Sequence, residues 1–233
     1  MTEILTVKGL DKNFGRKKVL NNLAFSLNTG RVVGLMGPNT AGKTTLIKIL
    51  SGLYRPTSGH ILIDGQPVGH KTRKIVSYMP DRNHLFPWMN TIDAIHYYRD
   101  MFSDFDSARA GELCDFFRID ENEKVNRLSN GMLKRVLVML TLARQARLYL
   151  LDEPIGGIDP LGCDLMIKAI RSTLNPDSTF LLSTHQVRDV ETLLDDVLFL
   201  NNGCLIFNEP AEDIREKRGQ SVQETYLEVF KNA

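Results

Sequence analysis

The stretch Gly37-Pro38-Asn39-Thr40-Ala41-Gly42-Lys43-Thr44-Thr45 decides the fold, because it has the spacing G-x-x-x-x-G-K-[ST] of a phosphate-binding loop. Residues 31–36 before it are short, apolar and rich in β-branched side chains, which indicates a buried strand. Residues 44–53 after it carry apolar side chains at helical spacing. A glycine loop between a strand and a helix N-terminus points backbone N–H groups at one place and favours an anion there. We therefore expect nucleotide phosphates here, with Lys43 reaching the β- and γ-phosphates and the Thr44 hydroxyl binding Mg²⁺.

Length and composition restrict the class of protein. With 233 residues, the chain can bury one substantial core with a smaller appended lobe. Its net charge of +1 provides no strong field that would indicate nucleic acid or anionic lipid as a partner. The three cysteines lie far apart, which beside a phosphate loop favours a reducing cytoplasm over a disulfide scaffold. No apolar run approaches the roughly 20 residues of a membrane span, and no signal peptide is visible, so we expect a soluble chain.

The remaining sequence predicts an α/β fold. Residues 1–30 alternate between polar and apolar side chains around glycine turns, which predicts antiparallel strands. Residues 88–145 contain helical patterns and no convincing strand, and we interpret them as a helical insertion. Elsewhere strands alternate with helices, which implies a mostly parallel core sheet. The expected strands lie at 60–65, 74–79, 148–152, 179–183 and on both sides of the Asn202-Gly203 turn, and the expected helices at 160–174, 186–194 and, as a charged tail, 210–233. We expect one domain over residues 1–233.

Two acidic residues follow the apolar strand at residues 148–151. Carboxyl ends of parallel strands form the edge at which α/β sheets bind ligands, so Asp152 is expected to be a second Mg²⁺ ligand, directly or through water. Glu153 would orient or deprotonate the attacking water. His185 ends another strand at the same edge and would contact the γ-phosphate and that water. The alternatives are a solvated acidic turn and a histidine that makes only a local hydrogen bond.

Five motifs in this order resemble those of the ATP-binding-cassette ATPases. The segment Leu128-Ser129-Asn130-Gly131-Met132 is similar to the family's signature motif, L-S-G-G-Q, and Gly157-Ile158-Asp159-Pro160 is similar to its D-loop. The phosphate loop, the Asp152-Glu153 pair and His185 as the switch histidine complete a resemblance that covers the whole chain. It implies ATP and Mg²⁺ as cofactors. It also implies a P-loop NTPase core with a mostly parallel sheet, an N-terminal antiparallel β subdomain and an inserted α-helical subdomain.

The signature motif also suggests a second chain. A serine hydroxyl and glycine N–H groups at a helix N-terminus form an anion site that the chain's own phosphate loop does not need. We therefore expect Ser129 and Gly131 of one chain to contact the γ-phosphate held by Lys43 of another chain, arranged head to tail. The simpler alternative, in which Ser129 only caps its helix, is compatible with this expectation.

Several positions depart from the pattern of the family. Thr40 replaces a glycine, and a positive φ there would strain its β-branched side chain. Asn130 and Met132 replace a glycine and the glutamine of the signature, and asparagine tolerates the left-handed conformation better than most residues. Asp81 stands in place of the Q-loop glutamine and would reach Mg²⁺ through water. Phe14 stands where an aromatic residue of the family stacks on adenine; alternatively it belongs to the core.

The resemblance implies the ATP-hydrolysing subunit of a membrane transporter, bound at the cytoplasmic face of the cell membrane. Its partners would be a second nucleotide-binding domain, identical or different, and a separately encoded permease, and not nucleic acid. The signature and Q-loop variants resemble the branch that serves drug, antibiotic or peptide exporters. In the family, the region of residues 84–89 receives the permease's coupling helix; alternatively, Phe86 and Trp88 are core residues of the helical lobe.

Two other functions are weighed against this one. A soluble cassette protein of DNA repair or translation usually has a long coiled-coil insertion or two cassettes in tandem, and this sequence has neither. A nucleotide-gated module that hardly hydrolyses ATP is suggested by Thr40 and Asp81, but Glu153 and His185 argue against it.

Overall fold

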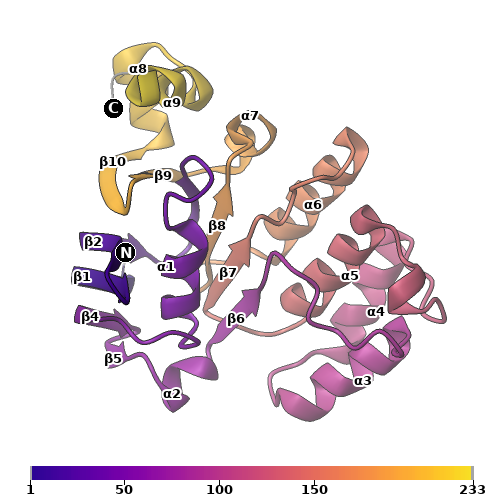
Figure 1. Cartoon of the computed structure of the whole chain (residues 1–233). Helices are drawn as coiled ribbons and strands as arrows, with labels where there is room; N and C mark the ends of the chain where they lie inside the picture. Colours follow the sequence, from indigo (N-terminus) through magenta and orange to yellow (C-terminus); the bar gives the residue numbers. More distant parts are fainter. Residues whose placement is uncertain (1, 232–233) are drawn as a thin grey trace.

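The computed structural model describes residues 2–231, which form two β-sheets with helices around them (Figure 1). The first sheet is antiparallel, and its strand order is β2-β1-β4-β5. Its strands are β1 (Glu3–Phe14), β2 (Lys17–Asn28), β4 (Ser58–Ile63) and β5 (Gln66–Pro67). Residues Leu23, Phe25 and Leu27 of β2 are buried and alternate with exposed neighbours. The predicted antiparallel N-terminal strands are thus confirmed.

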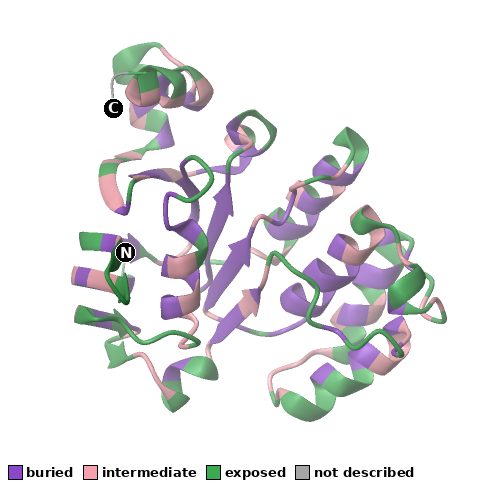
Figure 2. Ribbon diagram, in the orientation of Figure 1, coloured by how far each residue is buried: buried purple, intermediate pink, exposed green. Residues whose placement is uncertain are grey.

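The second sheet has six strands in the order β10-β9-β3-β8-β7-β6, and all neighbours run parallel except β9 and β10. Its strands are β3 (Val32–Met36), β6 (Val76–Met79), β7 (Leu148–Asp152), β8 (Thr179–Thr184), β9 (Asp196–Asn201) and β10 (Cys204–Pro210). Every residue of β3, β7 and β8 is buried, as expected for parallel strands covered on both faces (Figure 2). The predicted mostly parallel core sheet is confirmed.

The helix that follows the phosphate loop lies between the two sheets. This helix, α1 (Lys43–Leu50), buries Leu46, Ile47, Ile49 and Leu50. These side chains belong to one apolar cluster with residues from both sheets, including Leu23 of β2 and Leu150 of β7. The position of the loop is therefore set by a helix packed on both sides.

The opposite face of the six-stranded sheet carries the helical part of the chain (Figure 1). It contains α3 (Thr91–Met101), α4 (Ser107–Phe117), the short 3-10 helix η1 (Val125–Arg127) and α5 (Asn130–Leu142). Each of the three α-helices begins after a side-chain cap, supplied by Asn90, Asp106 and Ser129 respectively. The three predicted helical patterns are confirmed.

The chain after β7 differs from the sequence prediction at residues 186–194. The helix α6 (Pro160–Thr173) begins with proline in its first turn, as expected. The continuous helix predicted at residues 186–194 is instead α7 (Val187–Val190) followed by the 3-10 helix η2 (Glu191–Leu193). Its buried residues Val187, Val190 and Leu193 recur every three residues, which is the period of a 3-10 helix.

The C-terminal tail consists of two helices, α8 (Ala211–Arg218) and α9 (Val222–Lys231). Gly219 ends the first of them with φ of 63°, a left-handed cap that favours glycine. The last two residues of the predicted tail lie outside the described residues. Two short elements, β5 and α2 (His70–Arg73), were not predicted, because they are too short to show a period. Within residues 2–231, no helix has both the length and the apolar character that crossing a membrane requires.

Candidate functional site

The phosphate loop joins β3 to α1 and contains positions that need glycine. A Cβ atom on Gly37 would lie 2.1 Å from the carbonyl oxygen of Leu200, so no larger residue fits there. Gly42 has φ of 110° and precedes the first residue of α1. Thr40 has φ of 72°, so the backbone strain expected for a β-branched residue at this position is present.

Lys43, the first residue of α1, extends its side chain back to the loop and is only 6% exposed. Its ammonium group donates to the carbonyl oxygens of Gly37 and Pro38, at 2.7 and 3.2 Å, and lies 3.6 Å from a carboxylate oxygen of Glu153. Burial lowers the pKa of Lys43, and the negative charge of Glu153 opposes this shift. The loop thus presents a buried cation whose carbonyl partners a phosphate oxygen could replace.

Asp152 ends β7 beside the loop, as predicted, and is almost completely buried. Its Oδ1 accepts hydrogen bonds from the hydroxyl groups of Thr44, at 3.1 Å, and Ser183, at 2.7 Å. Burial raises the pKa of Asp152, and the hydrogen bonds from Ser183 and Thr44 act against that shift. The sequence prediction missed Ser183, although its place near the end of β8 at this sheet edge was a signal for it.

The oxygen atoms around Asp152 fit a magnesium site. The second carboxylate oxygen of Asp152, Oδ2, is buried and has no hydrogen-bond partner among the described residues 2–231. A buried carboxylate oxygen without a partner lowers the stability of the fold, unless a cation or a cation-bound water interacts with it. The hydroxyl groups of Thr44 and Ser183 both donate to Oδ1 of Asp152. These groups provide oxygen ligands, which Mg²⁺ prefers.

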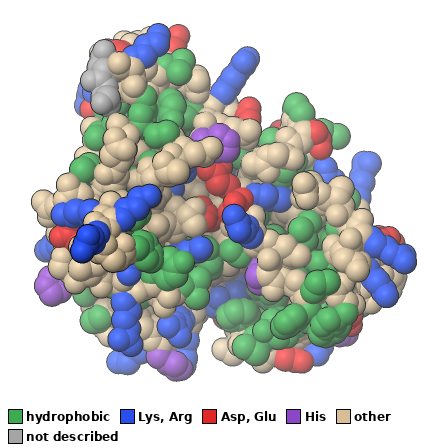
Figure 3. Space-filling view, viewed as in Figure 1, with side chains coloured by type: hydrophobic (Ala, Val, Ile, Leu, Met, Phe, Trp, Pro, Cys, Tyr) green, Lys and Arg blue, Asp and Glu red, His purple; other side chains and the backbone are tan. Residues whose placement is uncertain are grey.

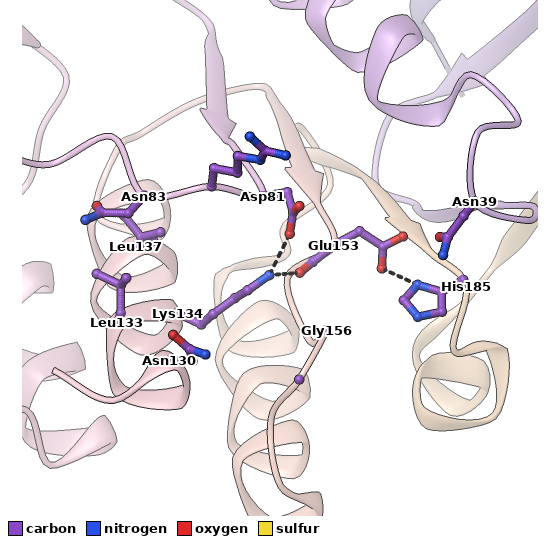
Figure 4. A pocket seen from close by; sticks show the side chains of 12 residues that line it. Asn39, Asp81, Asn83, Asn130, Leu133, Lys134, Leu137, Glu153, Gly156 and His185 are labelled. Atoms are coloured by element: carbon purple, nitrogen blue, oxygen red, sulfur yellow. Dashed lines mark hydrogen bonds and ion pairs between the residues drawn. The ribbon is translucent and has the colours of Figure 1, made fainter.

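Glu153 and His185 lie together at the same edge of the sheet. The Nδ1 atom of His185 is 3.0 Å from Oε2 of Glu153 (Figure 4). The ammonium group of Lys43 faces the other carboxylate oxygen of Glu153, at 3.6 Å. The Glu153 side chain is 14% exposed, whereas that of His185 is 41% exposed. Glu153 has φ of 51°, which is rare for a residue other than glycine. The alternative of a solvated acidic turn is therefore wrong, because the Glu153 carboxylate contacts both Lys43 and His185.

Asp81, expected to approach Mg²⁺, is engaged elsewhere in this structure. Its Oδ1 accepts a hydrogen bond from the ammonium group of Lys134 at 3.1 Å, and its side chain is 49% exposed. Lys134 also donates to the backbone carbonyl oxygen of Glu153. The sequence prediction missed Lys134; a lysine two residues before Val136, within a helix that is otherwise mainly apolar, was the available signal.

A cavity of about 530 Å³ joins these residues (Figure 4). It is lined by side chains from the phosphate loop, the segment after β6, α5 and the segments after β7 and β8, among them Asn39, Asp81, Asn130, Lys134, Glu153 and His185. Figure 3 shows acidic, basic and histidine side chains gathered near the centre of this face. The structure therefore brings Asp81, Glu153 and His185 around one space.

The signature residues lie at the start of α5. The Oγ atom of Ser129 accepts from the backbone N–H of Met132 at 3.2 Å, so Ser129 does cap its helix. Asn130 has an ordinary negative φ, so the left-handed conformation considered for it is not used. A Cβ atom added to Gly131 would meet open space. In residues 2–231, no hydrogen bond or ion pair joins Ser129 or Gly131 to the phosphate loop.

Three aromatic side chains considered as core residues are exposed. Phe14 is 46% exposed, and its ring meets that of Tyr54 edge to face at a centroid distance of 5.6 Å. Phe86 and Trp88 are 49% and 66% exposed and stack at 5.8 Å. The alternative assignment of these residues to the core is wrong, so their aromatic surfaces are free to contact other molecules.

Comparison with known proteins agrees with the geometry of the site. The model of the ABC transporter family matches residues 20–156. The Nod factor export ATP-binding protein I of Ralstonia nicotianae is 32% identical, with 97% of this chain and 73% of that protein covered. The protein of the same name from Burkholderia orbicola is 33% identical, with 94% and 75% covered.

Solved structures share the fold. One described as the ATP binding subunit of an ABC transporter is 28% identical and superposes with a TM-score of 0.88 over 97% of this chain and 99% of that one. A dimeric ATP-binding cassette bound to ADP and Pi shows the same fold at 21% identity, with a TM-score of 0.79 over 88% and 98% of the two chains. The chain therefore belongs to the ABC transporter family, as an ATP-binding and ATP-hydrolysing subunit.

Proposed function

We propose that residues 1–233 act as a single nucleotide-binding domain that powers a separate permease, with export as the direction of transport. The observation that carries this proposal is the position of the Glu153 carboxylate between Lys43 and His185. The export direction is supported by relatives named for Nod factor export, over nearly the whole chain. In this proposal the chain binds the cytoplasmic face of the cell membrane as a peripheral subunit.

Each residue of the site has a role in hydrolysis. The phosphate-loop N–H groups and Lys43 bind the phosphates, and Lys43 leaves the Gly37 carbonyl to do so. Glu153 accepts a proton from the attacking water, whose oxygen bonds to the γ-phosphorus as the bond to the β-phosphate breaks. His185 holds the Glu153 carboxylate and, being half-exposed, reaches toward the γ-phosphate.

Thr44 and Asp152 would hold Mg²⁺, with Asp81 acting through water. The unpartnered Oδ2 of Asp152, directly or through water, and the Thr44 hydroxyl would supply oxygen ligands. Lys134 engages only one carboxylate oxygen of Asp81, which leaves the other for water. The bound ion would neutralise charge that develops on the transferring phosphate oxygens.

Ser129 and Gly131 act in trans, on the nucleotide of a second copy or a related domain. A Cβ atom at residue 131 would meet open space, so packing within the chain does not require glycine there. A phosphate group that approaches from another chain would need the space that a side chain would fill. A cassette that shares this fold was solved as a dimer, which supports a second cassette as the partner. Phe14, with its exposed ring at the end of β1, stacks on adenine.

The permease binds the exposed aromatic surface beside the helical part. Phe86, Trp88, Tyr97 and Met101 are all at least 40% exposed, and Tyr97 meets the Phe86 ring at 6.4 Å. Figure 3 shows a hydrophobic patch at the lower right, where Figure 1 draws α3. Contiguous exposed apolar surface of this kind is typical of protein–protein contacts.

A second candidate is a nucleotide-gated module with little hydrolysis. Thr40 strains the phosphate loop, and Asp81 is engaged by Lys134 through one of its carboxylate oxygens. Measurement of phosphate release by the purified chain, with Lys43→Ala as the inactive control, separates the two functions. We expect magnesium-dependent turnover that the control lacks, whereas ATP binding with no turnover above the control would favour the gated module.

A further inference from the structure

Lys134 is an unusual lysine, because its side chain is 11% exposed while lysines are rarely buried without a partner. It lies in the second turn of α5, the helix that Ser129 caps. Its ammonium group donates to Oδ1 of Asp81 and to the backbone carbonyl of Glu153 (Figure 4). The Lys134 side chain therefore connects α5 to the segment after β6 and to Glu153, the residue after β7.

The backbone of Glu153 needs such support. Its φ of 51° places it in the left-handed region, which is unfavourable for a residue with a Cβ and persists only where neighbours hold it. Its N–H donates to the carbonyl and hydroxyl oxygens of Ser183, at 3.2 and 3.0 Å. Its carbonyl accepts from Lys134 and from the N–H of Gly156, at 3.3 Å. Of these partners, only Lys134 belongs to the helical part of the chain.

The direction of the Glu153 side chain follows from this backbone conformation. The Glu153 N–H is held by Ser183, so a rotation about the N–Cα bond of Glu153 out of the left-handed region would swing its carbonyl group and its side chain together. That rotation would carry the carboxylate away from both of its contacts, His185 at 3.0 Å and Lys43 at 3.6 Å. A misplacement of a reacting group by about 1 Å can lower the rate by about 100-fold. A contact to the carbonyl can thus control the rate although it never touches the nucleotide.

We propose that Lys134 is a positioning residue for ATP hydrolysis. Its ammonium group holds the Glu153 peptide in the left-handed conformation, and Asp81 holds the ammonium group. Through this charged pair, the position of the helical part determines the direction in which the Glu153 carboxylate points. The pairing also explains the acid in place of a Q-loop glutamine, because a buried ammonium group needs a negative partner. The inference rests on the proposed role of Glu153 as the base.

The first test replaces Lys134 by methionine, which is similar in length and cannot donate a hydrogen bond. We expect kcat to fall by about 10- to 100-fold while KM and the affinity for ATP change less than about twofold, because the phosphate loop is untouched. The matched control is Lys168→Met, on α6, which removes a surface ion pair to Asp164 from a lysine that is 60% exposed. A kcat of Lys134→Met within about twofold of the control overturns the proposal.

Two further variants separate positioning from general damage, at a temperature where circular dichroism shows every variant folded. Lys134→Gln keeps a donor for the Glu153 carbonyl, so it should recover part of the lost kcat. Asp81→Asn should lower kcat, and the double variant with Lys134→Met should lose less than the two single losses combined, because the pair acts in part as a unit. Equal losses for methionine and glutamine at Lys134, or fully additive losses in the double variant, contradict the proposal.

Glu153→Gln, measured in parallel, separates this inference from the proposed function. Full hydrolysis by Glu153→Gln would show that Glu153 is not the base. There would then be no reason for Lys134 to position its carboxylate. Loss of hydrolysis in Glu153→Gln together with full hydrolysis in Lys134→Met would leave the base in place and overturn only the role of Lys134.

Discussion

The replacement Glu153→Gln tests the chemistry of the site most specifically. Glutamine has nearly the same shape, so it can still contact His185, and Lys43 keeps the carbonyl oxygens of Gly37 and Pro38. It cannot accept a proton from water. We expect turnover to fall by about 100-fold or more, which corresponds to about 2.7 kcal/mol in the barrier, the scale of losing a general base.

The assay compares phosphate release at saturating ATP with ATP affinity measured by calorimetry. Affinity should be retained, because the phosphate loop is unchanged and a negative charge near the γ-phosphate is removed. The matched control is Glu112→Gln, which changes a glutamate that is 65% exposed in a surface pair with Arg109. Turnover of Glu153→Gln within about threefold of this control would refute the assignment of the base.

Three further predictions concern other parts of the chain. Phe14→Ala should weaken ATP binding by about 1–3 kcal/mol with little change in thermal stability, and a lower melting temperature with unchanged affinity would contradict the stacking role. Ser129→Arg should leave ATP binding intact and abolish turnover, because a bulky side chain would occupy the space meant for a partner's phosphate; normal turnover would argue against that space being used. Arg144→Met should lower the free energy of unfolding by about 3–5 kcal/mol in chemical denaturation, because Arg144 is 4% exposed and pairs with Asp104 at 2.9 Å; a change below about 1 kcal/mol would show the pair to be of little importance.

Local patterns predicted most of the fold. The spacing of the phosphate loop between an apolar run and a helical pattern gave β3 and α1, and the apolar run before Asp152 gave β7 at the correct edge. The error at residues 186–194 has a local cause, because apolar residues three apart are compatible with either an α-helix or a 3-10 helix. Period alone could not separate them.

The site was predicted less completely, because its contacts join distant segments. Lys134 meets Asp81 and Glu153 only after α5 packs beside the sheet, and no spacing within one segment contains that information. The exposure of Phe86 and Trp88 also depends on packing, since aromatic residues occur both in cores and on contact surfaces. By contrast, Asp152 and Thr44 were predictable because strand and helix ends meet at a fixed edge.

The central claim is that hydrolysis needs a site built from two chains, and the dependence of ATPase activity on protein concentration tests it most directly. Specific activity is measured over a dilution series while analytical ultracentrifugation of the same samples records the association state. The account predicts that activity per chain falls as the dimer dissociates, because Ser129 and Gly131 then have no partner nucleotide. Constant specific activity in samples that sediment only as monomer would contradict it.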